Sequence, residues 1–86
     1  MFKIIDYGFG NINSILNMMD SLGLSAKIIN KPDEIFTNDK IILPGVGSYD
    51  NAIFSLKKLG FFEILKNLTV NKEITLIGIC LGMQLL

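Results

Sequence analysis

Residues 40–48, KIILPGVGS, decide the fold, because a compact apolar run meets a proline and two glycines there. The run Lys40 to Leu43 is typical of a buried strand, and Pro44-Gly45-Val46-Gly47 stops it. Ser48 can then cap a helix that ends at Gly60. The expected apolar face of that helix consists of Ala52, Ile53, Leu56 and Leu59. The stretch therefore predicts a strand, a tight loop and a helix in succession.

The residues before this stretch predict the same kind of unit. Phe2 to Asp6 is a short apolar run that leads into a glycine pair, Gly8 and Gly10, and this pattern indicates a strand and a tight loop. A helix follows, capped by Asn11 or Asn13 and ended by Gly23. Its apolar stripe is Ile12, Ile15, Leu16, Met19 and Leu22. Residues 25–29 are a further strand, after which Pro32 with Asp33 interrupts the chain.

The residues after this stretch continue the alternation. Residues 61–68 are amphipathic but short, and the lysines around them indicate a solvated outer surface: Lys57, Lys58, Lys66 and Lys72. Thr75 to Ile79 is the last expected strand, and residues 82–86 look like the opening of a helix. We expect an α/β fold with an open, mostly parallel sheet and helices on both faces, and we expect the strands in residues 2–6, 25–29 and 40–43 to be buried on both sides.

Length and composition limit the function. The 86 residues make one small domain at most, residues 1–86, and we expect them to be the amino-terminal part of a longer domain. Half of the residues are apolar and the formal net charge is zero, so nucleic acid is not an expected partner. The longest uncharged stretch, residues 74–86, is too short to span a bilayer. One cysteine and no apolar leader favour a reducing cytoplasm.

Gly78-Ile79-Cys80-Leu81-Gly82 carries the clearest chemical signal. Glycines two residues either side of a nucleophile are typical of a sharp turn between a strand and a helix. At the amino terminus of a helix Cys80 would favour the thiolate, and Leu81 would offer a backbone N–H to the same place. The alternative is a small buried apolar residue at the end of a strand. The chain contains no histidine, so these residues cannot complete a relay of cysteine, histidine and carboxylate.

Three further features are compatible with more than one role. The glycines around Val46 would let a peptide N–H, near Val46 and Gly47, point at an oxyanion, but an ordinary tight turn has the same sequence. Gln84, one helical turn after Cys80, could hold a polar substrate or face solvent. The glycines at 8 and 10 lack the third glycine of a dinucleotide fingerprint and the Lys-Ser/Thr of a Walker loop, which argues against nucleotide binding.

Taken together, three segments closely resemble class I glutamine amidotransferases: residues 5–11, residues 43–47 and residues 78–86. Their order and spacing also match. Within the family, the opening Asp-Tyr-Gly-x-Gly-Asn and the Pro-Gly-Val-Gly are most similar to glutaminase subunits of imidazole glycerol phosphate synthase. The resemblance implies a flavodoxin-like fold and covers the whole chain, but only the first part of the family's domain.

The resemblance implies that Cys80 attacks the side-chain amide of glutamine, releasing ammonia and leaving a thioester that water cleaves. It places the oxyanion at Leu81, Val46 and Gly47, and glutamine contacts at Gly47 and Gln84. It also places the loop from Tyr7 to Asn13 near the site and the partner. It also implies no cofactor, no metal, and a (β/α)₈ cyclase subunit as the partner that uses the ammonia in histidine biosynthesis. The family's histidine and glutamate lie beyond Leu86, so we expect residues 1–86 alone to be inactive.

Two alternatives accompany this hypothesis. The chain could supply ammonia to another acceptor, because none of its residues identifies the partner's substrate. It could also be a non-enzymatic flavodoxin-like module in which Cys80 is buried and inert.

Overall fold

The computed structural model describes residues 1–8, 10–45 and 49–78, without the side chains of residues 49, 50 and 52. The strands are parallel, and they lie in the order β2-β1-β3-β4. Along the chain the elements are β1 (Phe2–Ile5), α1 (Ile12–Ser21), β2 (Ala26–Ile29), a short 3₁₀ helix η1 (Pro32–Glu34), β3 (Lys40–Leu43), α2 (Tyr49–Lys58), α3 (Phe61–Val70) and β4 (Thr75–Gly78). The predicted parallel α/β sheet is confirmed.

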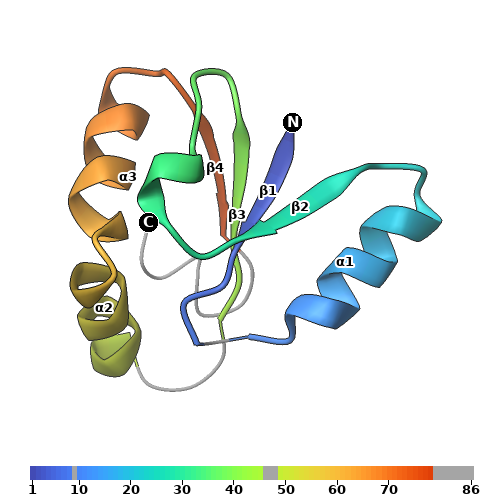
Figure 1. The fold of residues 1–86 in the computed structure, drawn as a ribbon, viewed down its shortest axis with the longest axis horizontal. Coiled ribbons are helices and arrows are strands. Elements are labelled where there is room, and N and C mark those ends of the chain that lie inside the picture. The colour runs from blue at the N-terminus through green and yellow to red at the C-terminus, as the bar shows by residue number, and fades with distance from the viewer. Residues whose placement is uncertain (9, 46–48, 79–86) are drawn as a thin grey trace.

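Helices cover both faces of the sheet, as predicted. Helix α1 lies on one face, and α2 and α3 lie on the other (Figure 1). Successive residues of a strand point to opposite faces, so each strand contributes to two separate apolar cores. The core under α2 and α3 includes Ile5, Ile29, Ile41, Leu43, Leu56, Phe61 and Leu65. The core under α1 is built from Ile4, Met19 and Ile42, with Phe2, Ile12, Ile15, Leu16 and Ile77 packed against it.

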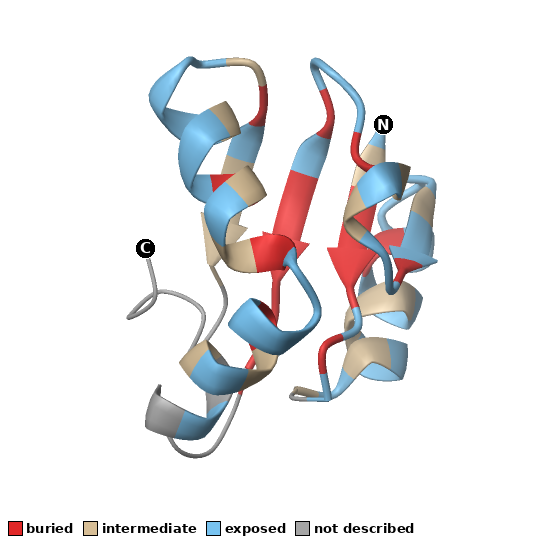
Figure 2. Cartoon of the chain, turned by 60° about the vertical axis from the view of Figure 1, so that its left-hand side comes forward, coloured by how far each residue is buried: buried red, intermediate tan, exposed pale blue. Residues whose placement is uncertain are grey.

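The expectation that the first three strands are buried on both sides was wrong for β2. The central strands β1 and β3 are almost fully buried, which Figure 2 shows in red. In the described part of the chain, β2 and β4 are the edges of the sheet. Ile28 on β2 is 37% exposed, and Thr75 on β4 is also exposed. An apolar run of four residues has the same composition in a central strand and in an edge strand, so the sequence did not separate the two.

The ends of α1 follow the predicted signals. The side chain of Asn11 accepts a hydrogen bond from the backbone N–H of Ser14 at 3.2 Å, which makes Asn11 the N-cap. At the other end the N–H of Gly23 donates to Asp20 and that of Leu24 donates to Met19, the pattern of a Schellman motif. Gly23 has φ +76, as this motif requires.

Two residues of the predicted apolar faces lie just outside their helices. Leu22 is the C-cap of α1 and is 66% exposed, and Leu59 follows the last residue of α2 and is 40% exposed. The amphipathic stretch predicted for 61–68 is a full helix, α3, whose Phe61 and Leu65 are buried. The four lysines assigned to a solvated surface are all exposed, as predicted.

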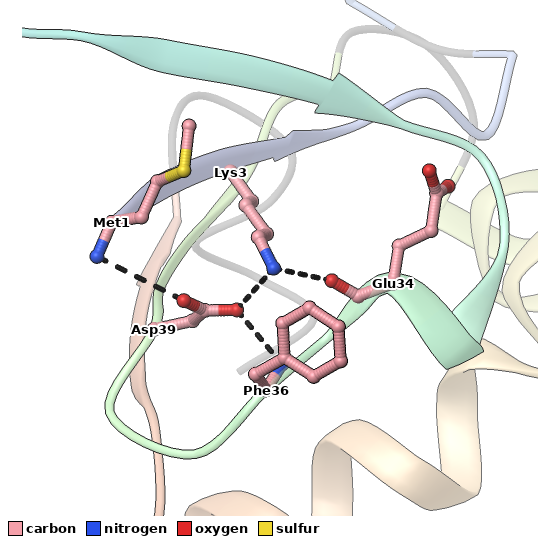
Figure 3. Close-up of polar contacts among 5 residues, drawn as sticks. All are labelled: Met1, Lys3, Glu34, Phe36 and Asp39. Atoms are coloured by element: carbon pink, nitrogen blue, oxygen red, sulfur yellow. Dashed lines mark hydrogen bonds and ion pairs between the residues drawn. The ribbon is translucent and has the colours of Figure 1, made fainter.

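A buried ion pair lies at the amino end of the sheet (Figure 3). Lys3 on β1 is only 4% exposed, and its Nζ lies 2.6 Å from the carboxylate of Asp39, which is 6% exposed. Nζ also donates to the backbone carbonyl of Glu34 and lies 4.1 Å from the centre of the Phe36 ring. These contacts join β1 to the segment between η1 and β3.

The carboxylate of Asp39 has two more partners. It accepts a hydrogen bond from the backbone N–H of Phe36 at 2.8 Å, and the amino group of Met1 lies 3.8 Å away. Burial pushes the pKa of Asp39 upward, but the hydrogen bonds from Lys3 and Phe36 and the nearby positive charges outweigh it. The pKa of Asp39 is therefore held below its usual value, and the pair is charged at neutral pH.

Candidate functional site

The candidate site lies at the carboxyl edge of the sheet, where the ends of parallel strands meet. Leu43, the last residue of β3, is the register partner of Gly78, the last residue of β4. Ile4 on β1 is paired with Ile42 on β3, so β1 ends at the same edge. Open α/β sheets bind their ligands outside this edge. The segments that follow β3 and β4 therefore begin side by side, as the predicted site requires.

The predicted site residues themselves lie outside the described residues. These are Cys80, Leu81, Val46, Gly47 and Gln84. The described part of the edge consists of the loop after β1, the first two residues after β3, and the end of β4. Its geometry defines the surroundings in which the predicted chemistry would take place.

The loop after β1 is tied to both of its neighbours. The N–H of Asp6 donates to the carbonyl of Ile29 at 2.8 Å, which holds the start of the loop beside β2. A carboxylate oxygen of Asp6 accepts from the N–H of Gly8 at 3.4 Å. Gly8 has φ +94 and Gly10 has φ +88. Residues with a Cβ atom rarely adopt these backbone angles. The two glycines predicted to form a tight loop do so.

Gly10 has a second constraint that Gly8 lacks. A Cβ atom on Gly10 would lie 2.8 Å from Cβ of Pro44 and 3.0 Å from N of Gly45, whereas one on Gly8 would have no neighbour within 4 Å. The loop after β1 is therefore packed directly on the segment after β3. Gly10 serves close backbone packing within the protein, a role different from that of a phosphate-binding glycine.

Tyr7 connects the loop to the rest of the edge. Its hydroxyl donates a hydrogen bond to the carbonyl of Pro44 at 2.5 Å, and its own carbonyl accepts one from Oγ of Ser55 on α2 at 2.6 Å. Tyr7 is 2% exposed, and burial raises the pKa of its phenol above the usual value. The phenol is therefore neutral at physiological pH and acts as a hydrogen-bond donor.

The family resemblance placed the loop from Tyr7 to Asn13 near the site, but sequence reasoning did not identify the hydrogen bond of Tyr7 to Pro44 and missed Ser55 as part of this edge. The available signal was a tyrosine directly after a buried strand, since a buried tyrosine hydroxyl needs a partner. Its partner, Pro44, is 37 residues away in the sequence and only becomes a neighbour in the folded chain.

An apolar groove of about 440 Å³ lies between the sheet and the helices α2 and α3. Its lining is Leu43, Leu56, Phe62, Leu65, Lys66, Thr69, Val70 and Leu76. Converging polar groups, which fix a small molecule in a binding site, are few in it. The carboxyl edge is thus the better candidate for chemistry.

Metal-ligand clusters and membrane-spanning helices are both absent from the described residues. Residues 1–8, 10–45 and 49–78 contain no group of three or more His, Cys, Asp and Glu side chains placed to hold a metal ion. No helix among them has the length and apolar character needed to cross a membrane.

Comparison with known proteins gives one consistent result. The family described as glutamine amidotransferase class-I matches residues 3–86. The imidazole glycerol phosphate synthase subunit HisH 2 of Methanococcus maripaludis is 50% identical over all 86 residues, which align with 43% of that protein. The subunit HisH of Bdellovibrio bacteriovorus is 42% identical over the whole chain and 42% of its own length. The subunit HisH 1 of Campylobacter jejuni is 42% identical over 99% of this chain and 42% of its own length. The chain thus spans less than half the length of these relatives.

Proposed function

This chain belongs to the class I glutamine amidotransferase family, and we propose that it is part of a glutaminase that releases ammonia from glutamine. The observation that carries the proposal is the match of the whole chain to proteins named as imidazole glycerol phosphate synthase subunits, at up to 50% identity. We also propose that residues 1–86 form the amino-terminal part of one amidotransferase domain. The proposed activity belongs to a chain as long as those relatives.

In the proposed reaction Cys80 is the nucleophile. Its thiolate would attack the side-chain amide carbon of glutamine, and the resulting tetrahedral intermediate would expel ammonia and leave a glutamyl thioester. Water would then cleave the thioester to glutamate and regenerate the thiol. A reactive thiolate needs a reduced cysteine, so the proposed place of action is the cytoplasm.

The oxyanion of the intermediate would be stabilised by backbone N–H groups. We assign this role to Leu81 and to the peptide region of Val46 and Gly47, with Gly47 and Gln84 in contact with the glutamine. The pairing of Leu43 with Gly78 supports the assignment, because the two segments that carry these residues start from neighbouring positions. Donors that are already oriented before the reaction stabilise developing charge without a reorganisation cost.

The partner in this proposal is the (β/α)₈ cyclase subunit of imidazole glycerol phosphate synthase, and the pathway is histidine biosynthesis. The relatives are named as subunits of that synthase, which supports a second subunit. Ammonia formed at the glutaminase would pass to this subunit. No cofactor enters the proposed hydrolysis.

The test is Cys80→Ser in the full-length chain assembled with the cyclase subunit. Glutamate formation should fall by about 10³-fold or more, because the nucleophile of a catalytic relay is removed. Lys58→Met, which changes an exposed side chain on α2, is the matched control and should keep the wild-type rate. Retained glutamine turnover in Cys80→Ser would refute the assignment of the nucleophile.

The identity of the acceptor needs its own measurement. Glutamine-dependent formation of imidazole glycerol phosphate by the reconstituted complex would support the histidine-pathway partner. If the cyclase subunit neither binds the glutaminase nor stimulates its activity, the ammonia goes to another acceptor.

A further inference from the structure

Among the described residues, Tyr7 is hydrogen-bonded to residues on both sides of the connection between β3 and α2. The hydroxyl holds the carbonyl of Pro44, at the start of this connection, and the backbone carbonyl holds Oγ of Ser55, on the helix that follows it. Tyr7 itself comes directly after β1, at the same sheet edge. Tyr7 thus contacts the described start of this connection and, inside α2, the helix that follows it.

The hydrogen bond to Pro44 has a consequence for the next residue. A trans peptide unit is planar, and the described chain contains no cis peptide bond, so fixing the carbonyl of Pro44 also fixes the direction of the N–H of Gly45. Gly10 packs against the same peptide from another side, close enough that a methyl group would not fit. The Pro44–Gly45 peptide therefore has little freedom to rotate.

The bond is also difficult to replace. Tyr7 is 2% exposed and Pro44 is fully buried, so water has poor access to either group. A buried carbonyl that loses its donor tends to move until it finds another partner, because an unpaired buried acceptor is costly. Loss of the Tyr7 hydroxyl should therefore alter the orientation of this peptide.

We propose that Tyr7 is a positioning residue for the glutaminase reaction, holding the Pro44–Gly45 peptide in the orientation that the adjoining oxyanion-binding segment requires. This inference rests on the proposed function. In this proposal the buried Tyr7 acts through Pro44 and Gly45. Its role is to keep the orientation of this peptide fixed, and that orientation matters most in the transition state.

The experiment uses Tyr7→Phe in the full-length chain with its cyclase subunit, which keeps the ring and removes only the hydroxyl. We expect kcat for glutamine hydrolysis to fall by about 5- to 30-fold, less than the roughly 10²- to 10³-fold loss seen when an oxyanion donor itself is removed. The KM for glutamine should stay within about twofold, because an interaction that matters only in the transition state lowers kcat. Unchanged kcat would overturn the proposal.

Two measurements separate positioning from general loosening. The rate at which iodoacetamide alkylates Cys80, followed by mass spectrometry of its peptide, should equal that of the wild type; a parallel fall in alkylation and kcat would overturn the proposal. Ser55→Ala removes the hydrogen bond to the backbone carbonyl of Tyr7 and should change kcat less than Tyr7→Phe. An equal loss would show that any weakening of this contact has the same effect, and would also overturn it.

Further controls cover folding and the proposed function. If Tyr7→Phe does not fold, 4-fluorophenylalanine at position 7 fills the volume of the hydroxyl without donating, and the same fall in kcat is expected. Wild type and Cys80→Ser are assayed in parallel. The positioning role alone would be rejected, and the proposed function kept, by one set of results. In that set the wild type turns over glutamine, Cys80→Ser does not, and the variant without the Tyr7 hydroxyl is fully active. Absence of glutamine turnover in the wild-type complex would reject the proposed function and this inference with it.

Discussion

Replacing Lys3 by methionine should destabilise the protein strongly, because it leaves a buried carboxylate with too few partners. In the wild type the carboxylate of Asp39 lies 2.6 Å from the Lys3 ammonium, and both side chains are less than a tenth exposed. Methionine fills most of the same volume, so the change removes mainly the charge. Among the described residues, the carboxylate then keeps the N–H of Phe36 and the amino group of Met1, which is 3.8 Å away.

The expected loss is about 3–5 kcal/mol of unfolding free energy, the usual cost of breaking a buried ion pair from one side. Urea denaturation of the full-length protein measures it. At a slope of about 2 kcal/mol per molar urea, the midpoint should fall by about 1.5–2.5 M. Lys58→Met, at an exposed position, should change stability by no more than about 0.5 kcal/mol.

A double variant tests whether the loss comes from the pair. Adding Asp39→Asn to Lys3→Met removes the unpaired charge while the amide oxygen still accepts from Phe36. The double variant should lose less unfolding free energy than the two single variants lose in sum. The difference, which is the coupling energy between the two positions, should be at least about 1 kcal/mol. The reasoning is refuted if Lys3→Met shifts the urea midpoint no further than Lys58→Met does.

Two other predictions follow from the same coordinates. Gly10→Ala should lower the free energy of unfolding by about 2–4 kcal/mol, measured by thermal or urea denaturation, because the strain of a positive φ adds to a clash with Pro44. Gly8→Ala should lower it by about 1 kcal/mol, from the positive φ alone. Equal losses in the two variants would contradict the packing argument. Because the folded-state pKa of Asp39 is lowered, its stabilisation is present above its unfolded pKa of about 3.9 and is lost as pH falls through the folded value. The stability gap between wild type and Asp39→Asn should therefore shrink in acid, and a gap that is constant from neutral pH into acid would contradict this sign.

Much of the fold could be predicted from local signals. The strand Lys40–Leu43 was predicted to the residue, since Pro44 and Gly45 end it sharply, and the cap at Asn11 and the stop at Gly23 were both correct. These features depend on one or two neighbouring residues. The short helix Pro32–Glu34 was not predicted, because a proline and two acids favour a turn as much as a turn of 3₁₀ helix.

The burial of Lys3 could not be predicted, because it depends on distant residues. In the sequence Lys3 is a charge inside a short apolar strand, while Glu34 and Asp39, which pair with it, lie more than thirty residues away. The same holds for the contact of Tyr7 with Pro44. The sequence shows which residues can carry charge or donate a hydrogen bond, but it does not show which distant residues they contact in the folded chain. The assignments of Cys80, Val46 and Gln84 stay predictions, since these residues lie outside the described part.

The two apolar cores also determine the alignment of the candidate site. Neighbouring residues of β4 serve opposite cores, Leu76 under α2 and α3 and Ile77 under α1. A slip of β4 by one residue would exchange these faces and move Gly78 away from Leu43. Substitutions among the apolar residues of β4 should thus disturb the proposed catalysis without changing any proposed reacting group, because a slip by one residue moves the start of one loop about 3.3 Å past the start of the other.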